Sequence, residues 1–178
     1  LLEGCPAARE LYPALFEALL LAKRHELGMP VFQASGPYPK PYEEAFLEVA
    51  REIGALYLGD GDIESAWPYL RAAGETKLVA DAIDKVQPRE NIDRIIEIAF
   101  HERVHPLKGF ELILANYGTC RAISFFEQYP PDASQEEARQ LLVRTLHSEV
   151  AENLKRAIAA REGTPPETDR LGELMAGR

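Results

Sequence analysis

The chain has 178 residues, of which 46% are hydrophobic and 28% are charged, and its formal net charge is −9. This length is enough for one domain with a substantial core. The acidic balance argues against nucleic-acid or anionic-membrane partners, since both reward clustered Lys and Arg. Two cysteines provide no disulfide framework and fit a reducing, cytoplasmic compartment. No apolar run is long enough to span a membrane, and the lack of an initiator methionine indicates a fragment or a processed form.

The N-terminal part of the chain combines one helix with a stiff connector. An apolar stripe predicts a helix over about 7–27, and Gly28 ends it. Four prolines in the segment 29–41 predict an extended connector. We therefore divide the sequence into an N-terminal helix and connector, 1–41, and a helical domain, 42–178, which together form one compact domain.

The next segment has the pattern of a helical hairpin, two antiparallel helices joined by a tight turn. Gly54 and Ala66 are small enough to let the two helices approach closely, while Tyr57 and Leu70 fill the space between them. A Gly-Asp-Gly-Asp sequence between the two halves ends the first helix and caps the second.

This spacing resembles a tetratricopeptide repeat over about residues 47–78. The resemblance implies stacked helical hairpins that bind a protein or peptide partner rather than catalyse a reaction. Tyr57, Trp67 and Tyr69 are the candidates to line the binding groove, because aromatic side chains are common anchors at interfaces.

Cap and turn signals continue to the end of the chain. Asn91 is a predicted N-cap, Gly118 suits a left-handed position after a helix, and Ser134 with Glu137 has the pattern of a capping box. The remaining predicted helices cover 76–86, 91–105, 107–117, 119–129, 134–162 and 164–177. No strand pattern is evident, so the predicted fold is all-α, with about nine helices arranged as a tetratricopeptide-like solenoid or helical array.

The segment from His101 to His105 carries the sharpest chemical signal, an H-E-x-x-H string on a predicted helix. Residues i and i+4 share a helix face, so the two imidazoles could bind one zinc ion and Glu102 could act as general base. The string resembles that of the zincin metallopeptidases. However, Arg103 and Pro106 depart from the zincin pattern, and neither a third ligand at the usual spacing nor a β-sheet is evident. We expect structural roles for these residues and keep a zinc hydrolase as the alternative.

Cys120 is the second catalytic candidate, and a thiol enzyme is a third, weaker functional hypothesis after the scaffold and the zinc hydrolase. This residue falls in the first turn of a predicted helix, where the thiolate form is favoured, and a thiol enzyme would use it as nucleophile. Ile123 and Phe126 lie at helical spacing from it, so a packed, unreactive cysteine is the preferred interpretation.

The sequence therefore predicts a non-catalytic scaffold module without a resident metal or cofactor. Its partner is a protein or peptide, and a neutral or basic one, because like charges oppose docking.

Overall fold

The computed structural model describes residues 6–30, 37–164, 166, 168 and 170–176. These residues form helices and turns without any β-strand, which confirms the all-α prediction. They contain eight α-helices where about nine were expected, and the helix over 106–126 is interrupted at Gly118, where the sequence predicted a break between two helices. The chain divides into two compact units, with the boundary between Lys108 and Gly109.

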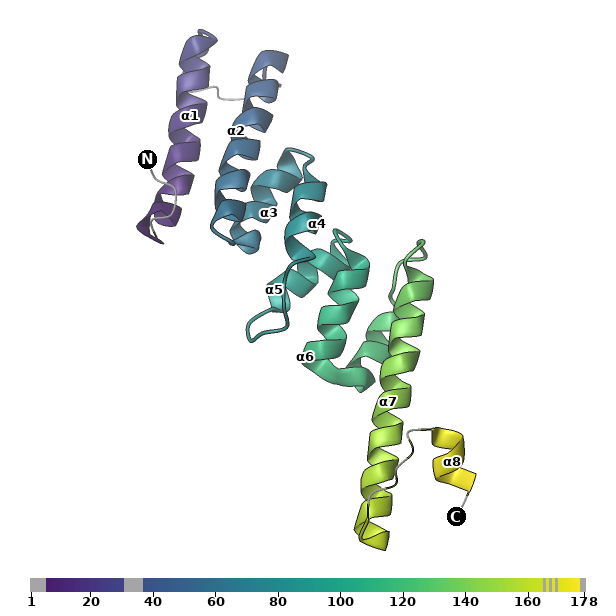
Figure 1. Ribbon diagram of the computed structural model, residues 1–178. Coiled ribbons are helices and arrows are strands. Elements are labelled where there is room, and N and C mark those ends of the chain that lie inside the picture. The colour runs from purple at the N-terminus through teal and green to yellow at the C-terminus, as the bar shows by residue number, and fades with distance from the viewer. Residues whose placement is uncertain (1–5, 31–36, 165, 167, 169, 177–178) are drawn as a thin grey trace. The chain divides into compact units, whose positions relative to one another are not determined.

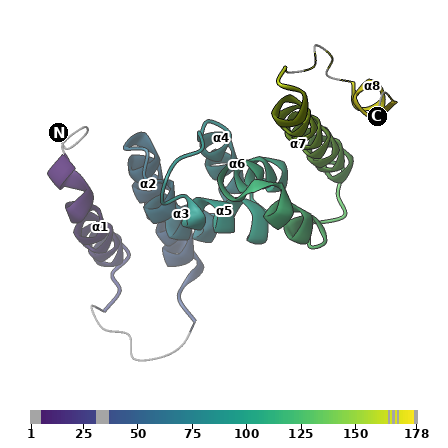
Figure 2. The same cartoon turned by 90° about the horizontal axis from the view of Figure 1, so that it is seen from below.

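The first unit is built around the longest of its helices. Its elements are a 3₁₀-helix (Pro6–Leu11), α1 (Tyr12–Glu26), α2 (Lys40–Gly59), α3 (Ile63–Ala72), α4 (Thr76–Ile83), α5 (Asp93–Ile96) and a π-helical turn (Glu97–His101). Helix α1 lies on one side of α2, and α3 and α4 lie on the other (Figures 1 and 2).

Ring contacts fix α1 and α2 as antiparallel neighbours. At one end the rings of Tyr12 and Tyr57 meet edge to face, with centroids 4.9 Å apart. At the other end the Arg24 guanidinium lies over the Tyr42 ring, 5.4 Å from its centroid. Helix α1 therefore packs along α2 within the first unit, across the connector at which the sequence analysis placed a segment boundary.

Helices α2 and α3 form the predicted hairpin. A Cβ atom added to Gly54 would lie only 2.5 Å from Cγ of Leu70, so the glycine is what allows the close approach. Ala66 and Leu70 are completely buried between the helices. Asp62 caps α3, since its Oδ1 accepts a hydrogen bond from the backbone N–H of Ser65 at 3.0 Å. The small-residue contact and the cap are thus both confirmed.

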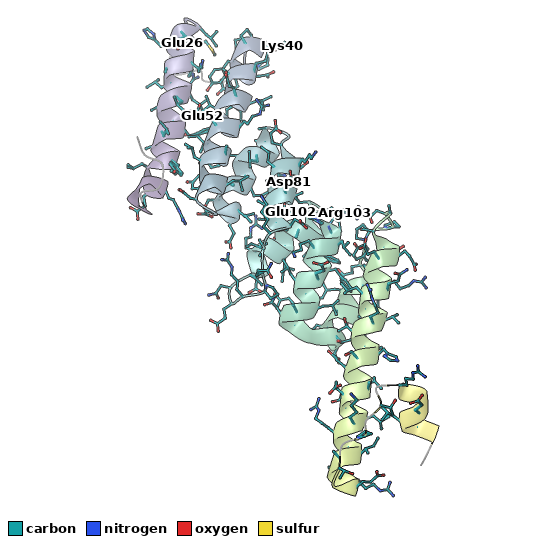
Figure 3. The ribbon with its side chains drawn as sticks, viewed as in Figure 1. Glu26, Lys40, Glu52, Asp81, Glu102 and Arg103 are labelled. Carbon is teal, nitrogen blue, oxygen red and sulfur yellow. The ribbon has the colours of Figure 1, made fainter. Side chains whose placement is uncertain are left out.

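Helix α3 covers only part of α2. The two helices have 10 and 20 residues, which correspond to about 15 and 30 Å at 1.5 Å per residue. Gly74, at φ +76°, ends α3, and the next residue, Glu75, pairs with Arg51 of α2 at 2.7 Å. The turns of α2 before Arg51 therefore extend beyond the end of α3. Figure 3 shows Lys40 at the far end of this extension.

The helix predicted over 91–105 is wrong at both ends. Asn91 has φ +56° and lies outside α5, for which Ile92 is the N-cap. The helix widens into the π-helical turn and ends at His101, and Arg103 then reverses the chain at φ +60°. Proline disfavours helical geometry in the residue before it, so Pro106 restricts the end of this segment.

The second unit consists of most of α6 (Pro106–Phe126), α7 (Gln135–Glu162) and α8 (Leu171–Ala176). Gly118 interrupts α6 with φ 78° and ψ 172°, at the position predicted for a left-handed glycine. The two arms then pack through aromatic rings: Phe110 lies 5.7 Å from both Phe126 and Tyr129.

Two expectations for this unit change. Ser134 is the N-cap residue of α7 but makes no side-chain capping bond; its hydroxyl shares a 2.6 Å hydrogen bond with the Tyr129 hydroxyl instead. The capping box with Glu137 is therefore wrong. The last helix begins at Leu171 rather than near 164, and part of the predicted range lies outside the described residues.

Candidate functional site

The H-E-x-x-H string does not lie on one helix. His101 is the last residue of the π-helical turn, Arg103 has a left-handed backbone, and His105 directly precedes α6. The helical i, i+4 geometry that would bring the two imidazoles onto one face is therefore not formed. Instead, Nδ1 of His105 accepts a long hydrogen bond from the backbone N–H of Lys108 at 3.4 Å, and its Nε2 lies 3.5 Å from Oδ1 of Asp84.

Glu102 holds parts of the first unit together. Its Oε2 accepts hydrogen bonds from Nε1 of Trp67 at 2.9 Å and from Nη1 of Arg71 at 2.8 Å. Its Oε1 lies 3.5 Å from Nη2 of Arg94. The carboxylate is thus engaged by α3 and α5, and only 21% of the side chain is exposed. Two hydrogen bonds and one ion pair occupy this carboxylate, which a general base would have to present to a metal-bound water.

Metal binding needs converging ligands, and the described residues contain no group of three or more His, Cys, Asp and Glu side chains that could hold an ion. The zinc site of the alternative reading would need His101, His105 and a third ligand to come together. The structure supplies no such arrangement in the part of the chain that it describes.

The three predicted groove aromatics lie in or next to the core. Tyr57 and Trp67 are only 6% and 4% exposed. Tyr69 is half-buried, stacks on Tyr57 at 5.8 Å and meets the ring of Phe16 edge to face at 5.1 Å. Tyr57 and Tyr69 join α1, α2 and α3 to one another, and the indole of Trp67 bonds to Glu102, so contacts within the unit account for their positions.

Cys120 is exposed, so the expectation of a packed cysteine is wrong. Thr119 and Ala122 face the interior of the second unit, and the intervening Cys120 therefore points outward. The Thr119 hydroxyl donates a hydrogen bond to Oε1 of Glu149 at 2.6 Å. Among the described residues, no hydrogen bond or ion pair links Cys120 to a histidine, so a Cys–His pair is not formed.

An apolar cleft lies at the start of α2 in the first unit. It encloses about 490 Å³ and is lined by Tyr38, Tyr42, Glu43, Phe46 and Leu47. Tyr38 and Leu47 are 44% and 39% exposed, whereas Tyr42 forms the buried floor. We refer to these five residues as the α2 cleft.

Contacts with α1 support one wall of the α2 cleft. The ring of Tyr42 lies between Tyr38, 4.9 Å away, and the Arg24 guanidinium. Arg24 also lies over the Tyr38 ring at 5.8 Å, and cation–π contacts of this kind contribute roughly 0.5–1 kcal/mol at exposed sites. Phe46 rests edge to face on Phe16 of α1 at 5.6 Å. The aromatic wall is thus held in place before any partner binds.

The cleft carries charges of both signs. Glu43 lines it, and the Arg24 guanidinium lies over the Tyr38 and Tyr42 rings. Glu48 follows on the exposed side of α2, outside the cleft lining. Neither carboxylate has an ion-pair or hydrogen-bond partner among the described residues, whereas the nearby Glu44 lies 4.0 Å from Lys40.

The sequence analysis missed this cleft, although a signal for it exists. Tyr38, Tyr42 and Phe46 recur at intervals of four, which is the spacing of one helix face. The proline-rich composition before them directed attention to a connector. This face of α2 is exposed because another helix, α3, is short. The spacing of residues within α2 does not reveal the length of α3.

A second cleft, of about 410 Å³, lies between the α2–α3 turn and the end of α4. Its wall includes Gly61, Ile63 and Val86, together with Lys85, Gln87 and Arg89. Three of its eight lining residues are long polar side chains, and the lining contains no aromatic ring, unlike that of the α2 cleft.

No protein-family model matches this chain, and neither a curated protein nor a solved structure matches it. Among the described helices, none combines the length and apolar character needed to cross a lipid bilayer.

Proposed function

We propose that this chain is a non-catalytic protein- or peptide-binding module that works as a helical-repeat scaffold in the cytoplasm. The observation that carries the proposal is the α2 cleft, a preformed apolar surface with the exposed side chains of Tyr38 and Leu47 at its edge. Apolar grooves with an acidic or basic edge are a common way for helical proteins to hold a peptide.

Two further observations support a scaffold rather than a hydrolase. Glu102, the only candidate for a general base in the H-E-x-x-H string, is engaged by Trp67 and Arg71. The α2–α3 hairpin has the close contact between Gly54 and Leu70 that the tetratricopeptide resemblance implies. We extend this resemblance to a solenoid of stacked hairpins, and the exposed thiol of Cys120 fits a reducing compartment.

Site-specific photo-crosslinking tests the proposal. A photoreactive amino acid replaces Leu47 at the α2 cleft, and a matched variant carries it at Leu78 of α4, which is similarly exposed at 41%. In extract from the source cells, we expect a defined set of proteins to be captured at position 47 and not at position 78. Equal capture at both positions, together with hydrolytic activity that His105→Ala abolishes, would move the protein to the enzyme class.

A further inference from the structure

We infer that the α2 cleft takes one face of a short amphipathic helix that carries large apolar side chains flanked by Lys or Arg. This inference rests on the proposed binding function and names the chemistry of the partner segment. It follows from the length of the uncovered part of α2, from the shape of its apolar wall and from the charge at its edge.

The uncovered part of α2 continues the interface that α3 uses. Leu70 packs on Gly54, and α3 ends at the level of Arg51, where Glu75 forms its ion pair. Residues 40–48 of α2 extend beyond this point over about 13 Å, which is the length of roughly two and a half helical turns. They expose Glu43 and Leu47, whereas Val49 and Ala50 are already buried. A partner helix of that length would lie on α2 where a longer α3 would have continued.

The wall of the cleft fits the side chains of such a helix. Tyr42 and Phe46 present one row along α2, and Glu43 and Leu47 present the adjacent row. The groove between these two rows can accept a ridge of a second helix. An i, i+4 pair of Leu or Phe side chains on that ridge can therefore enter the hollow of about 490 Å³. The contacts of Tyr42 with Arg24 and of Phe46 with Phe16 keep this wall rigid.

The charge at the edge selects the flanks of the partner. Glu43 lies in the cleft wall without an ion-pair partner among the described residues, whereas the Arg24 guanidinium is held against the Tyr38 and Tyr42 rings. A Lys or Arg beside the apolar pair of the partner would meet this carboxylate, whereas a Glu there would be repelled. At longer range, the net charge of −9 also attracts a basic partner and repels an acidic one.

Three synthetic peptides of about 18 residues test the inference, since shorter helices are marginal in water. The first has an i, i+4 Leu/Phe stripe with Lys on both flanks, the second has the same stripe with Glu on the flanks, and the third has the residues of the first in an order that destroys the stripe. Fluorescence anisotropy with the full chain measures each Kd. We expect the first peptide to bind at least about tenfold more tightly than the other two, the effect of one favourable interaction at a binding site.

Two pairs of variants locate the site. Leu47→Ser should weaken binding of the Lys peptide by roughly tenfold, and Leu78→Ser should leave it unchanged. Glu43→Lys should shift preference towards the Glu peptide, whereas Glu48→Lys, which changes the net charge equally, should not. All four positions are exposed, and circular dichroism melting verifies that each variant is folded.

The outcomes separate this inference from the proposed function. If Leu47→Ser weakens the binding of all three peptides equally, the cleft binds peptides, but the inferred preference for an amphipathic helix with basic flanks is wrong. If no peptide binds, or if Leu78→Ser weakens binding as much as Leu47→Ser, the inference is overturned as well. Only capture at position 47 in the crosslinking experiment decides the broader binding function.

Discussion

The indole Nε1 of Trp67 donates a 2.9 Å hydrogen bond to Oε2 of Glu102, a residue 35 positions further along the chain. This bond connects α3 to the segment that follows the π-helical turn. It also explains why the glutamate of an H-E-x-x-H string can serve the fold: the wide turn and the left-handed Arg103 bring its carboxylate to the indole and to Arg71. Zinc chemistry would need the same carboxylate to face a metal-bound water.

Glu102→Ala should destabilise the first unit. The substitution leaves the buried indole N–H of Trp67 without its acceptor, and an unsatisfied buried donor costs about 1–3 kcal/mol. Urea unfolding measures the loss. A double-mutant cycle with Trp67→Phe, which keeps the ring packing and removes the donor, should show a positive coupling energy. If the effects of the two substitutions on the free energy of unfolding are additive, the hydrogen bond contributes nothing to stability.

Two glycines of α2 give a matched test of the hairpin. Gly54→Ala places a methyl group against the completely buried Leu70, and overpacking of this kind costs about 1–3 kcal/mol. Gly59→Ala meets no atom within 4 Å and should be neutral or stabilising by up to about 1 kcal/mol, because alanine favours helix. The comparison uses denaturation midpoints. A Gly54→Ala variant as stable as Gly59→Ala would show that the contact between Gly54 and Leu70 does not require a glycine.

Much of the fold could be predicted from local patterns. The small residues Gly54 and Ala66, the cap at Asp62 and the break at Gly118 are properties of short segments, so spacing and turn chemistry reveal them. The end of the helix at His101 was not predictable in this way, because the donors that hold Glu102, Trp67 and Arg71, come from the distant helix α3. The α2 cleft was missed for the same reason: it exists because α3 is short, which no pattern within α2 records.

Stability should fall at alkaline pH. Burial raises the pKa of Tyr57, and the neighbouring Tyr69 and Asp62 raise it further. Below the ordinary value of 10.0, both the folded and the unfolded chain keep the phenol proton. As pH rises above that value, the unfolded chain releases the proton first, so the free energy of unfolding decreases until the folded phenol also ionises.

Tyr57→Phe is the variant that checks this. Urea unfolding at several pH values around and above 10.0 should show a weaker decline for Tyr57→Phe than for the parent chain. Burial also raises the pKa of Tyr69 and Tyr129, so part of the decline should remain. An unchanged pH dependence in the variant would exclude Tyr57 as a contributor.

Removal of metal should not change stability. His101 and His105 do not share a helix face, and Glu102 is engaged by Trp67, so we expect equal melting temperatures with and without EDTA. Added zinc should give no stoichiometric stabilisation, whereas a resident site would couple binding to folding. A marked drop in melting temperature with EDTA, lost equally in His101→Ala and His105→Ala, would restore the zinc hydrolase.

The most direct test of the central claim is an amide NMR titration of the full chain with the Lys-flanked helical peptide. We expect chemical-shift changes centred on residues 38–47, with little change at the segment from His101 to His105. Shifts that avoid residues 38–47, or their persistence unchanged in the Leu47→Ser variant, would contradict the assignment of the α2 cleft as the binding site.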